Sequence, residues 1–490
     1  MSNIDYTQLI EDALNNYQGA SLHERIMSIH TQAINKGDNI TYPHARSINL
    51  VISTNTPYSI PLPVHTDFNN CHFTVKNNTN RDIALFSLYK APVTISFSKD
   101  DIFKGNNLST DYPTLGPTPK LLRITDEHWT ERTGFTTNVS RNDLLYIEDY
   151  EIKNEPIAGY SECEVEPSYA FYSVTGEEII VENAKFTRNP ESTKITKFLW
   201  INGNYNVKVC NIEIFTPTSV NIVEGDECFS IEDSAKLLFM NIVIHGTYST
   251  ESGAGYGFGM SNVYNSSFIN VECYNVIWGL FGTNNTNVAY LYGCSINRFD
   301  IHCYGRDVIC ENCTFKKTNE LSSTNHIFNR FSSMYGSIIY RNCSFERFRP
   351  LRIDPAYNAY TPFKLIMINC YLRVSNFSKS IIDLMNFDTT ENDREELKKK
   401  YLPNIEIIGL SLHADADVSN IYVFKTDYDI EEPLSVLPSI SHLNIDIDRF
   451  EKDGTNAVNL LYSDHNIELL GKSIVSFSKE ILDNTIIPII

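Results

Sequence analysis

Arg298, Asp300 and His302 alternate with apolar residues within the segment Gly293–Phe315. Alternate side chains of a β-strand point to the same face, so this spacing predicts an outward row of a cation, a carboxylate and an imidazole. Neighbours in such a row lie about 6.5–7 Å apart along the strand. Charges at this distance change the proton affinity of a carboxyl group, so the row could support acid–base chemistry. The simpler interpretation is a solvated face with salt bridges.

A second short strand after the turn at residues 304–306 adds carboxylates to the row. Its alternation predicts that Val308 and Cys310 point inward and that Asp307 and Glu311 point outward. The candidate catalytic residues are Arg298, Asp300, His302, Arg306, Asp307 and Glu311.

Two kinds of polysaccharide cleavage fit this set of side chains. In a glycoside hydrolase, one of the three acids would protonate the leaving oxygen while another activates water or attacks carbon. In a lyase acting on a uronic acid, His302 or Tyr304 would remove the proton beside the carboxylate, and Arg298 or Arg306 would stabilise the anion. The sequence leaves both mechanisms open.

The same stretch belongs to a repeat of the form Asn-Cys-x-apolar. The steps are 19 residues from Gly293 to Asn312, 30 to Asn342 and 27 to Asn369. Upstream, Asn241 to Asn270 is 29 residues, and 23 more lead to Gly293. Steps of this size are typical of stacked solenoid coils.

The aromatic content of 12% and the missing helical periodicity favour coils of β-strands over pairs of helices. In a parallel β-helix, equivalent residues of successive coils stack on one another. We therefore expect the repeated Cys and aromatic residues to form internal columns and the Asn residues to form ladders at turns.

These β coils, with Arg-Phe-Asp-x-His in one of them, resemble the right-handed, single-stranded parallel β-helix of the pectin-lyase-like kind in bacteriophage tailspike and appendage proteins. The resemblance is clearest over residues 45–375. It implies a homotrimeric protein of the virion tail that contacts other tail proteins. It also implies that this protein binds a bacterial surface polysaccharide, with cleavage of that polysaccharide as the expected activity. The alternatives are a non-catalytic receptor-binding or structural spike and a bacterial carbohydrate-active enzyme.

Composition narrows the classes of partner. The chain of 490 residues carries 60 acidic and 40 basic residues, a formal charge of −20, which disfavours nucleic acid as a partner.

The 11 cysteines are an odd number, and several fall at inward positions of the repeat, so we expect buried free thiols. The pair Cys310-x-x-Cys313 lacks a second pair at zinc-ligand spacing, so we expect neither a metal nor a cofactor.

The N-terminus lacks a basic region followed by an apolar run, and no stretch approaches the ~18 apolar residues of a membrane span. We therefore expect synthesis in a host cytoplasm without a signal peptide, no membrane insertion, and release within a particle.

Four segments follow from the patterns. Residues 1–44 predict two helices, over 5–17 and from a capping box at Ser21–Glu24 to a stop at Gly37, as a cap or attachment segment. Residues 45–195 predict the first coils with long loop excursions, and residues 196–375 predict regular coils. Residues 376–490, with a short charged helix at 389–400, predict either widened coils or a small β-rich cap.

Several further residues are candidates for binding sugar. Tyr256 and Trp278 could stack on a pyranose ring or pack in the core. If the coil FERFRPLRIDP (345–355) lies over the Arg298 row, its arginines would form a cationic trough for a carboxylate-bearing sugar; otherwise they form surface ion pairs. The candidate substrate-binding residues are Tyr256, Trp278, Tyr304, Arg349, Arg352 and Asp354.

Overall fold

The computed structural model describes most of the chain. It covers residues 4–53, 59–96, 108–111, 116–126, 141–154, 167–192, 194, 196–217, 226–246, 255–274, 276, 278–316, 328–331, 334–353, 363–375, 380–384, 404–414, 420–426, 436–437, 439–446, 457–462, 468–469 and 475–477. The chain divides into two compact units. Unit 1 comprises residues 1–126 and 142–282, and unit 2 comprises residues 127–141 and 283–490.

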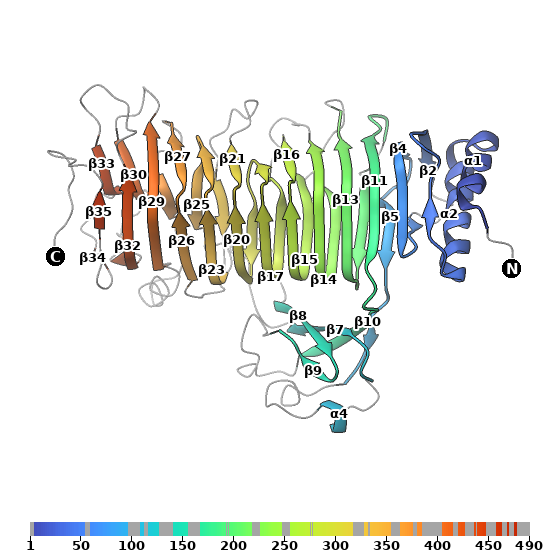
Figure 1. Cartoon of the computed structure of the whole chain (residues 1–490), viewed down its shortest axis with the longest axis horizontal. Coiled ribbons are helices and arrows are strands. Elements are labelled where there is room, and N and C mark those ends of the chain that lie inside the picture. Colours follow the sequence, from blue (N-terminus) through green and yellow to red (C-terminus); the bar gives the residue numbers. More distant parts are fainter. Residues whose placement is uncertain are drawn as a thin grey trace. The chain divides into compact units, whose positions relative to one another are not determined.

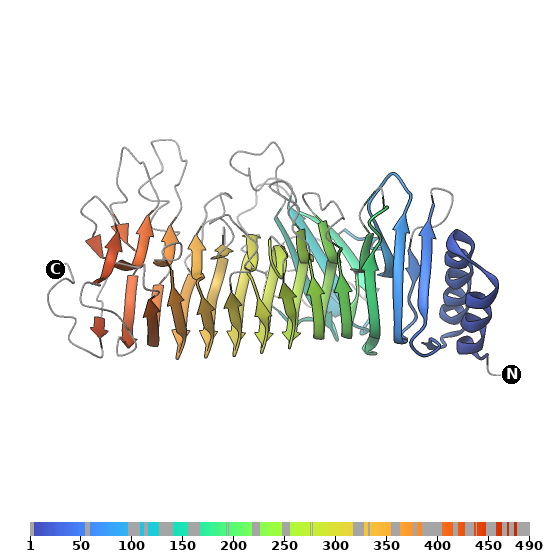
Figure 2. The same cartoon turned by 90° about the horizontal axis from the view of Figure 1, so that it is seen from above.

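The coils of unit 1 are parallel strands that pair with their equivalents in the next coil. One stack runs β1-β4-β11-β13-β14 and another runs β3-β5-β12-β14-β15. The strands are β1 (Ile40–Thr41), β2 (Ser47–Ile52), β3 (Ile60–Pro61), β4 (His65–Asn77), β5 (Ile83–Tyr89), β11 (Ile179–Arg188), β12 (Thr196–Asn202), β13 (Tyr205–Phe215), β14 (Asp226–His245), β15 (Gly255–Ile269) and β16 (Glu272–Tyr274). Figures 1 and 2 show these strands running side by side.

Aromatic rings fill the interior of these coils, as the repeat predicts. Phe86, Phe198 and Phe229 are fully buried and stack in sequence, with centroids 5.6 and 5.8 Å apart. Phe258 continues the column, its ring parallel to that of Phe229 at 4.5 Å. Burial of such large apolar side chains is the main stabilising contribution to the coils.

An asparagine ladder marks one turn of each coil in unit 1. Asn183, Asn211, Asn241 and Asn270 all have φ between 52° and 62°. Asparagine tolerates this left-handed conformation better than most residues. Each amide group also donates to the side-chain oxygen of the previous coil, over 2.9, 3.1 and 3.4 Å in turn. The predicted turn ladder is therefore confirmed.

Two helices cover the first coils of unit 1 (Figure 1). Helix α1 (Tyr6–Asn16) is capped by Asp5, whose carboxylate accepts from the Gln8 amide. Helix α2 (Gly19–Lys36) ends at Gly37 with φ 71°, as predicted. The predicted capping box is wrong, because α2 begins at Gly19 and the Ser21 hydroxyl donates to the Gln18 carbonyl.

The apolar side of α2 faces the chain itself. Leu22, Ile26 and Ile29 are buried, and Gly19 forms a parallel bridge with Leu50 of β2. These contacts favour the capping role over a three-fold contact through the same stripe. None of the described helices is long and apolar enough to cross a membrane.

The excursion between β5 and β11 is a folded antiparallel sheet rather than a set of loops. Its strands follow the order β6-β10-β7-β8-β9, and it has its own core around Leu122, Ile124 and Leu145. A second cluster joins Tyr172 of the sheet to Ala235 of β14. The elements are β6 (Val93–Thr94), α4 (Leu108–Asp111), β7 (Lys120–Asp126), β8 (Arg141–Glu148), β9 (Glu151–Ile152) and β10 (Ser168–Ser173).

The coils of unit 2 form three parallel stacks. These run β17-β20-β23-β26-β29-β32-β35, β18-β21-β24-β27-β29 and β19-β22-β25-β28-β30-β33. The strands are β17 (Phe281–Tyr292), β18 (Ser295–Ile296), β19 (Asp300–Cys303), β20 (Gly305–Glu311), β21 (Thr314–Lys316), β22 (Phe328–Phe331), β23 (Met334–Arg341), β24 (Ser344–Glu346), β25 (Arg349–Ile353), β26 (Phe363–Ile368), β27 (Tyr371–Val374), β28 (Ser380–Leu384), β29 (Asn404–Ala414), β30 (Asn420–Thr426), β31 (Val436–Leu437), β32 (Ser439–Asp446), β33 (Ala457–Tyr462), β34 (Glu468–Leu469) and β35 (Val475–Phe477).

The Asn-Cys repeat sets the turns of unit 2. Asn312, Asn342 and Asn369 have φ between 51° and 54°, and the cysteine that follows each of them is buried with a free thiol. Burial raises the pKa of Cys370 to about 11, which keeps this thiol protonated. Of the described strands beyond residue 403, β29, β30, β32, β33 and β35 continue the parallel stacks, whereas β31 and β34 pair with each other. The first group favours widened coils over a separate cap. The predicted helix at 389–400 lies outside the described residues.

Candidate functional site

The Arg298 row is not exposed as predicted. Arg298 and Asp300 are both 0% exposed, and Arg298 is the largest fully buried side chain of the described residues. The guanidinium binds the carboxylate in a bidentate manner, with Nε 2.9 Å from Oδ1 and Nη2 2.5 Å from Oδ2. Strand β19 begins only at Asp300, so Arg298 does not follow its alternation. Phe299 and Ile301 are buried too, so both faces of this segment are covered.

His302 is the member of the row that reaches solvent. Its side chain is 18% exposed, and its Nε2 lies 3.9 Å from Oδ2 of Asp300. A polysaccharide would therefore meet His302 before the buried carboxylate. The Arg298–Asp300 pair has the burial and geometry of an ion pair that holds its segment in place, because desolvated partners depend on each other.

The other two acids of the row bridge neighbouring coils. The Asp307 carboxylate accepts from the Ser337 amide at 2.7 Å and from its hydroxyl at 3.0 Å. Gly336 makes room for this contact, since a Cβ there would lie 2.2 Å from Oδ1 of Asp307. Glu311 accepts from the Tyr290 hydroxyl at 2.8 Å. Both acids are partly exposed, and both lie on inter-coil hydrogen bonds.

The coil 345–355 does not lie directly over the Arg298 row, so the condition for the predicted cationic trough is not met. Arg330 of β22 is in register with Asp300, and Arg352 of β25 is in register with Arg330. The coil of Arg352 is therefore two coils from Asp300 rather than directly above it. Arg349 is only 8% exposed. Asp354 lies outside the described residues.

Tyr304 directly precedes β20, and Arg306 is the second residue of this strand. Tyr304 has φ 51° and is 2% exposed, so its predicted role in touching substrate is contradicted by burial. Arg306 is partly exposed, and its Nε lies 3.7 Å from Oδ2 of Asp307.

A second polar surface lies on unit 1, and we call it the Trp200 face. Tyr89 is 54% exposed, and its ring lies 5.0 Å from that of Trp200 at an angle of 33°. Trp200 is in register with Ser230, and Glu227 with Tyr256. The Trp200 face consists of Tyr89, Lys197, Trp200, Asn202, Glu227, Ser230, Glu232 and Tyr256, of which Asn202 and Ser230 are buried.

Glu227 occupies the middle of the Trp200 face. Its carboxylate forms an ion pair with Lys197 and accepts from the Ser230 hydroxyl at 2.8 Å. The side chains of Glu227 and Lys197 are 15% and 21% exposed. Gly259 leaves space for the carboxylate, because a Cβ there would lie 1.3 Å from Oε2 of Glu227. The missing side chain at Gly259 thus leaves room for the carboxyl group of Glu227 on the neighbouring coil.

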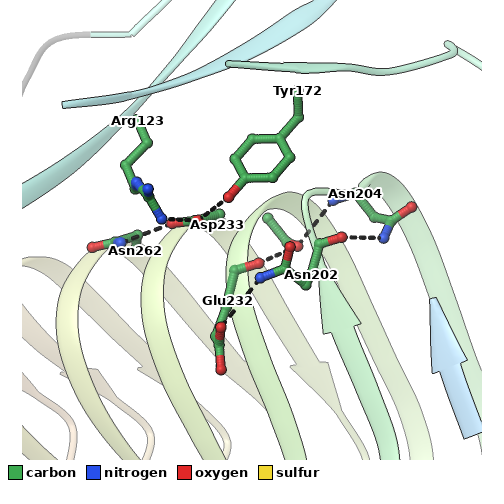
Figure 3. Close-up of polar contacts among 8 residues, drawn as sticks. Arg123, Tyr172, Asn202, Asn204, Glu232, Asp233 and Asn262 are labelled. Carbon is green, nitrogen blue, oxygen red and sulfur yellow. Dashed lines mark hydrogen bonds and ion pairs between the residues drawn. The ribbon is translucent and has the colours of Figure 1, made fainter. Parts of the chain in front are cut away.

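Glu232 and Asp233 are adjacent in sequence and point in different directions (Figure 3). Asp233 has φ 46°, which turns the strand at this position. Its buried carboxylate accepts from Arg123 Nη1 and Asn262 Nδ2, both at 2.8 Å, and from the Tyr172 hydroxyl. Asp233 therefore anchors the small antiparallel sheet to β14.

Glu232 belongs to the Trp200 face. Its carboxylate accepts from Asn202 Nδ2 at 3.2 Å, an interaction drawn in Figure 3. Burial raises the pKa of Glu232, and the negative charges of Asp233 and Glu227 raise it further. A carboxyl group of this kind, next to aromatic rings and a second acid, is typical of glycan-cleaving sites.

The structure brings one predicted sugar-binding residue onto this face. The ring of Tyr256 packs on Gly282, where a Cβ would lie 2.4 Å from Cζ. The amide of Trp278 donates to the Gly255 carbonyl at 3.1 Å, at the start of the same strand as Tyr256. Phe258, two residues after Tyr256, is fully buried.

The sequence interpretation missed Trp200, Glu227 and Glu232. The spacing Glu227-x-x-Ser230-x-Glu232 does not alternate strictly, because Cys228 and Phe229 are both buried. The sequence does contain a signal for this face. Lys197 and Trp200 are three residues apart, as are Glu227 and Ser230, and the second pair follows the first by 30 residues, which is one coil. Across the described part of the chain, no group of three or more His, Cys, Asp or Glu side chains could hold a metal ion.

Two solved structures that resemble the chain are phage tailspikes. The tailspike protein gp49 from Pseudomonas phage LKA1 has a TM-score of 0.56 and 12% sequence identity, over 90% of this chain and 71% of that one. The tailspike gp61 of Pseudomonas phage phi297 has a TM-score of 0.52 and 11% identity, over 94% and 82%. No family model matches the sequence, and no curated protein matches it significantly. The chain therefore has a parallel β-helix fold similar to that of phage tailspikes.

Proposed function

We propose that the protein binds a bacterial surface polysaccharide on the Trp200 face and cleaves it there. The observation that carries this proposal is the line of Tyr89 and Trp200 on adjacent coils, next to Glu227 and Glu232. Adjacent coils are about 4.8 Å apart, so the two rings form one platform for a sugar ring. Carboxyl groups beside such a platform can transfer protons at a glycosidic bond.

The fold supports this proposal. Tailspike-like β-helices expose long rows of side chains on successive coils, and a linear polymer fits such a surface. We propose a homotrimer in the virion tail, in contact with other tail proteins. The formal charge of −20 makes nucleic acid an unsuitable partner.

The Arg298 row is a second candidate for the catalytic centre. Its accessible members are His302, Arg306, Asp307 and Glu311, with Arg330 and Arg352 on the next coils. The burial of Arg298 and Asp300 favours the Trp200 face over this row. A receptor-binding spike without catalysis and a bacterial carbohydrate-active enzyme remain the competing functions, and the following experiment separates them from the proposed one.

Purified protein should bind at least one member of a panel of purified capsular polysaccharides, measured by calorimetry. Chain shortening would be followed by size-exclusion chromatography. Trp200→Ala should weaken binding at least 10-fold, because about 1.4 kcal/mol of stacking energy would be lost. Tyr17→Ala removes an aromatic ring that is 41% exposed on the N-terminal helices and serves as the matched control.

Binding without shortening would identify a non-catalytic spike. Full binding by Trp200→Ala would move the site away from the Trp200 face, and Arg306→Ala would then test the Arg298 row. Absence of the protein from purified virions of a producing host would favour the bacterial enzyme.

A further inference from the structure

We propose that the Trp200 face cleaves its glycan by hydrolysis, with Glu232 as the general acid and Glu227 as the general base. The inference rests on the proposed function and assigns a role to each carboxyl group. It also chooses between hydrolysis and elimination, which the sequence alone leaves open.

Glu232 has the surroundings of a proton donor. Its carboxyl group is partly covered by the coil, and this burial together with the neighbouring Asp233 and Glu227 raises its pKa. Asp233 cannot take this role, because Arg123, Tyr172 and Asn262 occupy its carboxylate. Glu232 has a single hydrogen bond from Asn202 in the described part of the chain, so one oxygen can turn toward a leaving group.

Glu227 has the surroundings of a proton acceptor. Its ion pair with Lys197 stabilises the negative charge, and the Ser230 hydroxyl fixes its direction. The two acids therefore differ in their electrostatic surroundings, although they belong to the same strand. Such a difference between neighbouring carboxyl groups is what an acid–base pair requires.

The separation of the two acids favours an inverting reaction. The Glu227 carboxylate lies at the Ser230 hydroxyl, and Ser230 and Glu232 are alternate residues of one face. Alternate residues lie about 6.5–7 Å apart. Inverting glycosidases hold their carboxyl groups roughly 6.5–9.5 Å apart to leave room for water, whereas retaining enzymes need about 5–5.5 Å.

The reaction consumes one water molecule per bond. The glycosidic C–O bond breaks as Glu232 gives its proton to the leaving oxygen, while water adds to the anomeric carbon from the opposite side. Glu227 takes the proton released by that water, and proton exchange with solvent restores both groups. The products are two shorter chains, one of which has a new reducing end of inverted configuration.

The charges of the Trp200 face disfavour elimination. A lyase needs a cation to neutralise the carboxylate of a uronic acid. Lys197, the cation in the middle of this face, is already paired with Glu227. Glu227 and Glu232 would repel a uronate placed between them. We therefore infer that the sugar at the cleavage point is neutral.

The test uses the full chain and a capsular polysaccharide that the wild-type protein shortens. Glu232→Gln should reduce the release of reducing ends at least 10²-fold while binding changes less than 3-fold. Glu227→Gln should give a similar loss. Glu213→Gln, an acid paired with Lys185 on β13 outside the Trp200 face, is the matched control and should keep the full rate.

The pH profile gives a second readout. In the wild-type protein the rate should fall at high pH as Glu232 loses its proton, and this limb should disappear in the residual activity of Glu232→Gln. The groups that face Glu232 are Asp233 and Glu227 of β14 and Lys197 and Asn202 of β12. Nuclear magnetic resonance of the first product should show the inverted anomer.

Three results would overturn the inference while leaving the binding function intact. They are full activity of both glutamine variants, ultraviolet absorbance of a new carbon–carbon double bond in the products, and a wild-type protein that binds but never shortens the glycan. A wild-type protein that binds no polysaccharide would instead overturn the proposed function. If Glu232→Gln fails to fold, Glu227→Gln carries the test alone.

Discussion

Asp300 is the counter-ion of the fully buried Arg298, and this burial determines the effect of removing its charge. Asp300→Asn leaves the guanidinium without its carboxylate in a desolvated site, which costs roughly 3–5 kcal/mol of stability for pairs of this kind. We expect the melting temperature to fall by several degrees, measured at one scan rate. Below that temperature, glycan binding should be retained.

Glu346→Gln is the matched control for Asp300→Asn, because Glu346 is exposed on β24. Its melting temperature should stay within about one degree of the wild-type value, as expected for surface substitutions. A thermally unchanged Asp300→Asn variant with lost cleavage would support the Arg298 row as the catalytic centre.

At the residue scale, residue types and spacings predict which side chains interact, but they do not predict how exposed those side chains are. The sequence correctly places Arg298 beside Asp300, although Arg298 precedes the strand and reaches the carboxylate without sharing its alternation. It cannot predict their burial, because covering of the outer face depends on residues far away in the chain. Glu232 and Trp200 were missed for a related reason: their face is defined only when residues about 30 positions apart stack in adjacent coils.

At the scale of elements, α2 is well predicted in its extent and ending, and its buried histidines have a consequence for pH. His23 is fully buried, and neither of its ring nitrogens has a hydrogen-bond partner among the described residues. His30 is also fully buried, and its ring contacts the Pro61 carbonyl and the Tyr42 hydroxyl. Burial lowers the pKa of His23 from 6.5 to about 4 and that of His30 to about 3.

We expect stability to fall as the pH drops below 6.5. The unfolded chain binds protons on both histidines below this pH, whereas the folded chain keeps them neutral down to about pH 4. Each histidine then contributes a loss of about 1.4 kcal/mol per pH unit over that range. His23→Leu should remove its share, about 2 kcal/mol between pH 6.5 and pH 5, measured by denaturant unfolding.

The control for this pH dependence is His44→Gln, since His44 is exposed beside Asn69. This variant should follow the wild-type curve. Equal losses for wild type and His23→Leu would mean that the carboxyl groups, rather than this histidine, cause the acid sensitivity.

The small antiparallel sheet shows what the element patterns leave out. The segment between Tyr89 and Ile179 lacks the coil repeat, so the sequence predicts loops and small strands there without their pairing. The turn residues of this segment can be recognised in the sequence. The strand order β6-β10-β7-β8-β9 cannot, because it brings together strands that are distant in sequence. Such pairing depends on long-range contacts that a local pattern does not encode.

At the scale of the whole molecule, the repeat predicts the fold of both units because each coil repeats the same local requirements. Asn at a left-handed turn, a small buried thiol after it and an inward aromatic residue recur in coil after coil. A sequence that repeats such requirements specifies a stack of coils even at the 12% and 11% identity to the two tailspikes.

The last prediction concerns assembly, and an exposed aromatic column of unit 1 provides its surface. Phe215 is 47% exposed, and His245 and Tyr274 stand in register with it on the next two coils. The ring centroids are 6.5 and 5.9 Å apart along the column. Exposed apolar surface that continues over several coils is typical of protein–protein contacts, so we expect light scattering to give a mass near three times the 55.9 kDa of one chain.

Replacing Phe215 and Tyr274 together by serine should raise the concentration at which the trimer dissociates at least 10-fold, because two aromatic rings would leave the contact. Tyr89→Ser removes a similarly exposed ring from the Trp200 face and should leave the mass unchanged. A mass near that of one chain at every concentration would contradict the trimer. An unaltered dissociation curve for the double variant would leave the trimer in place and assign the contact to another face, since the column would then stabilise only the coils that carry it.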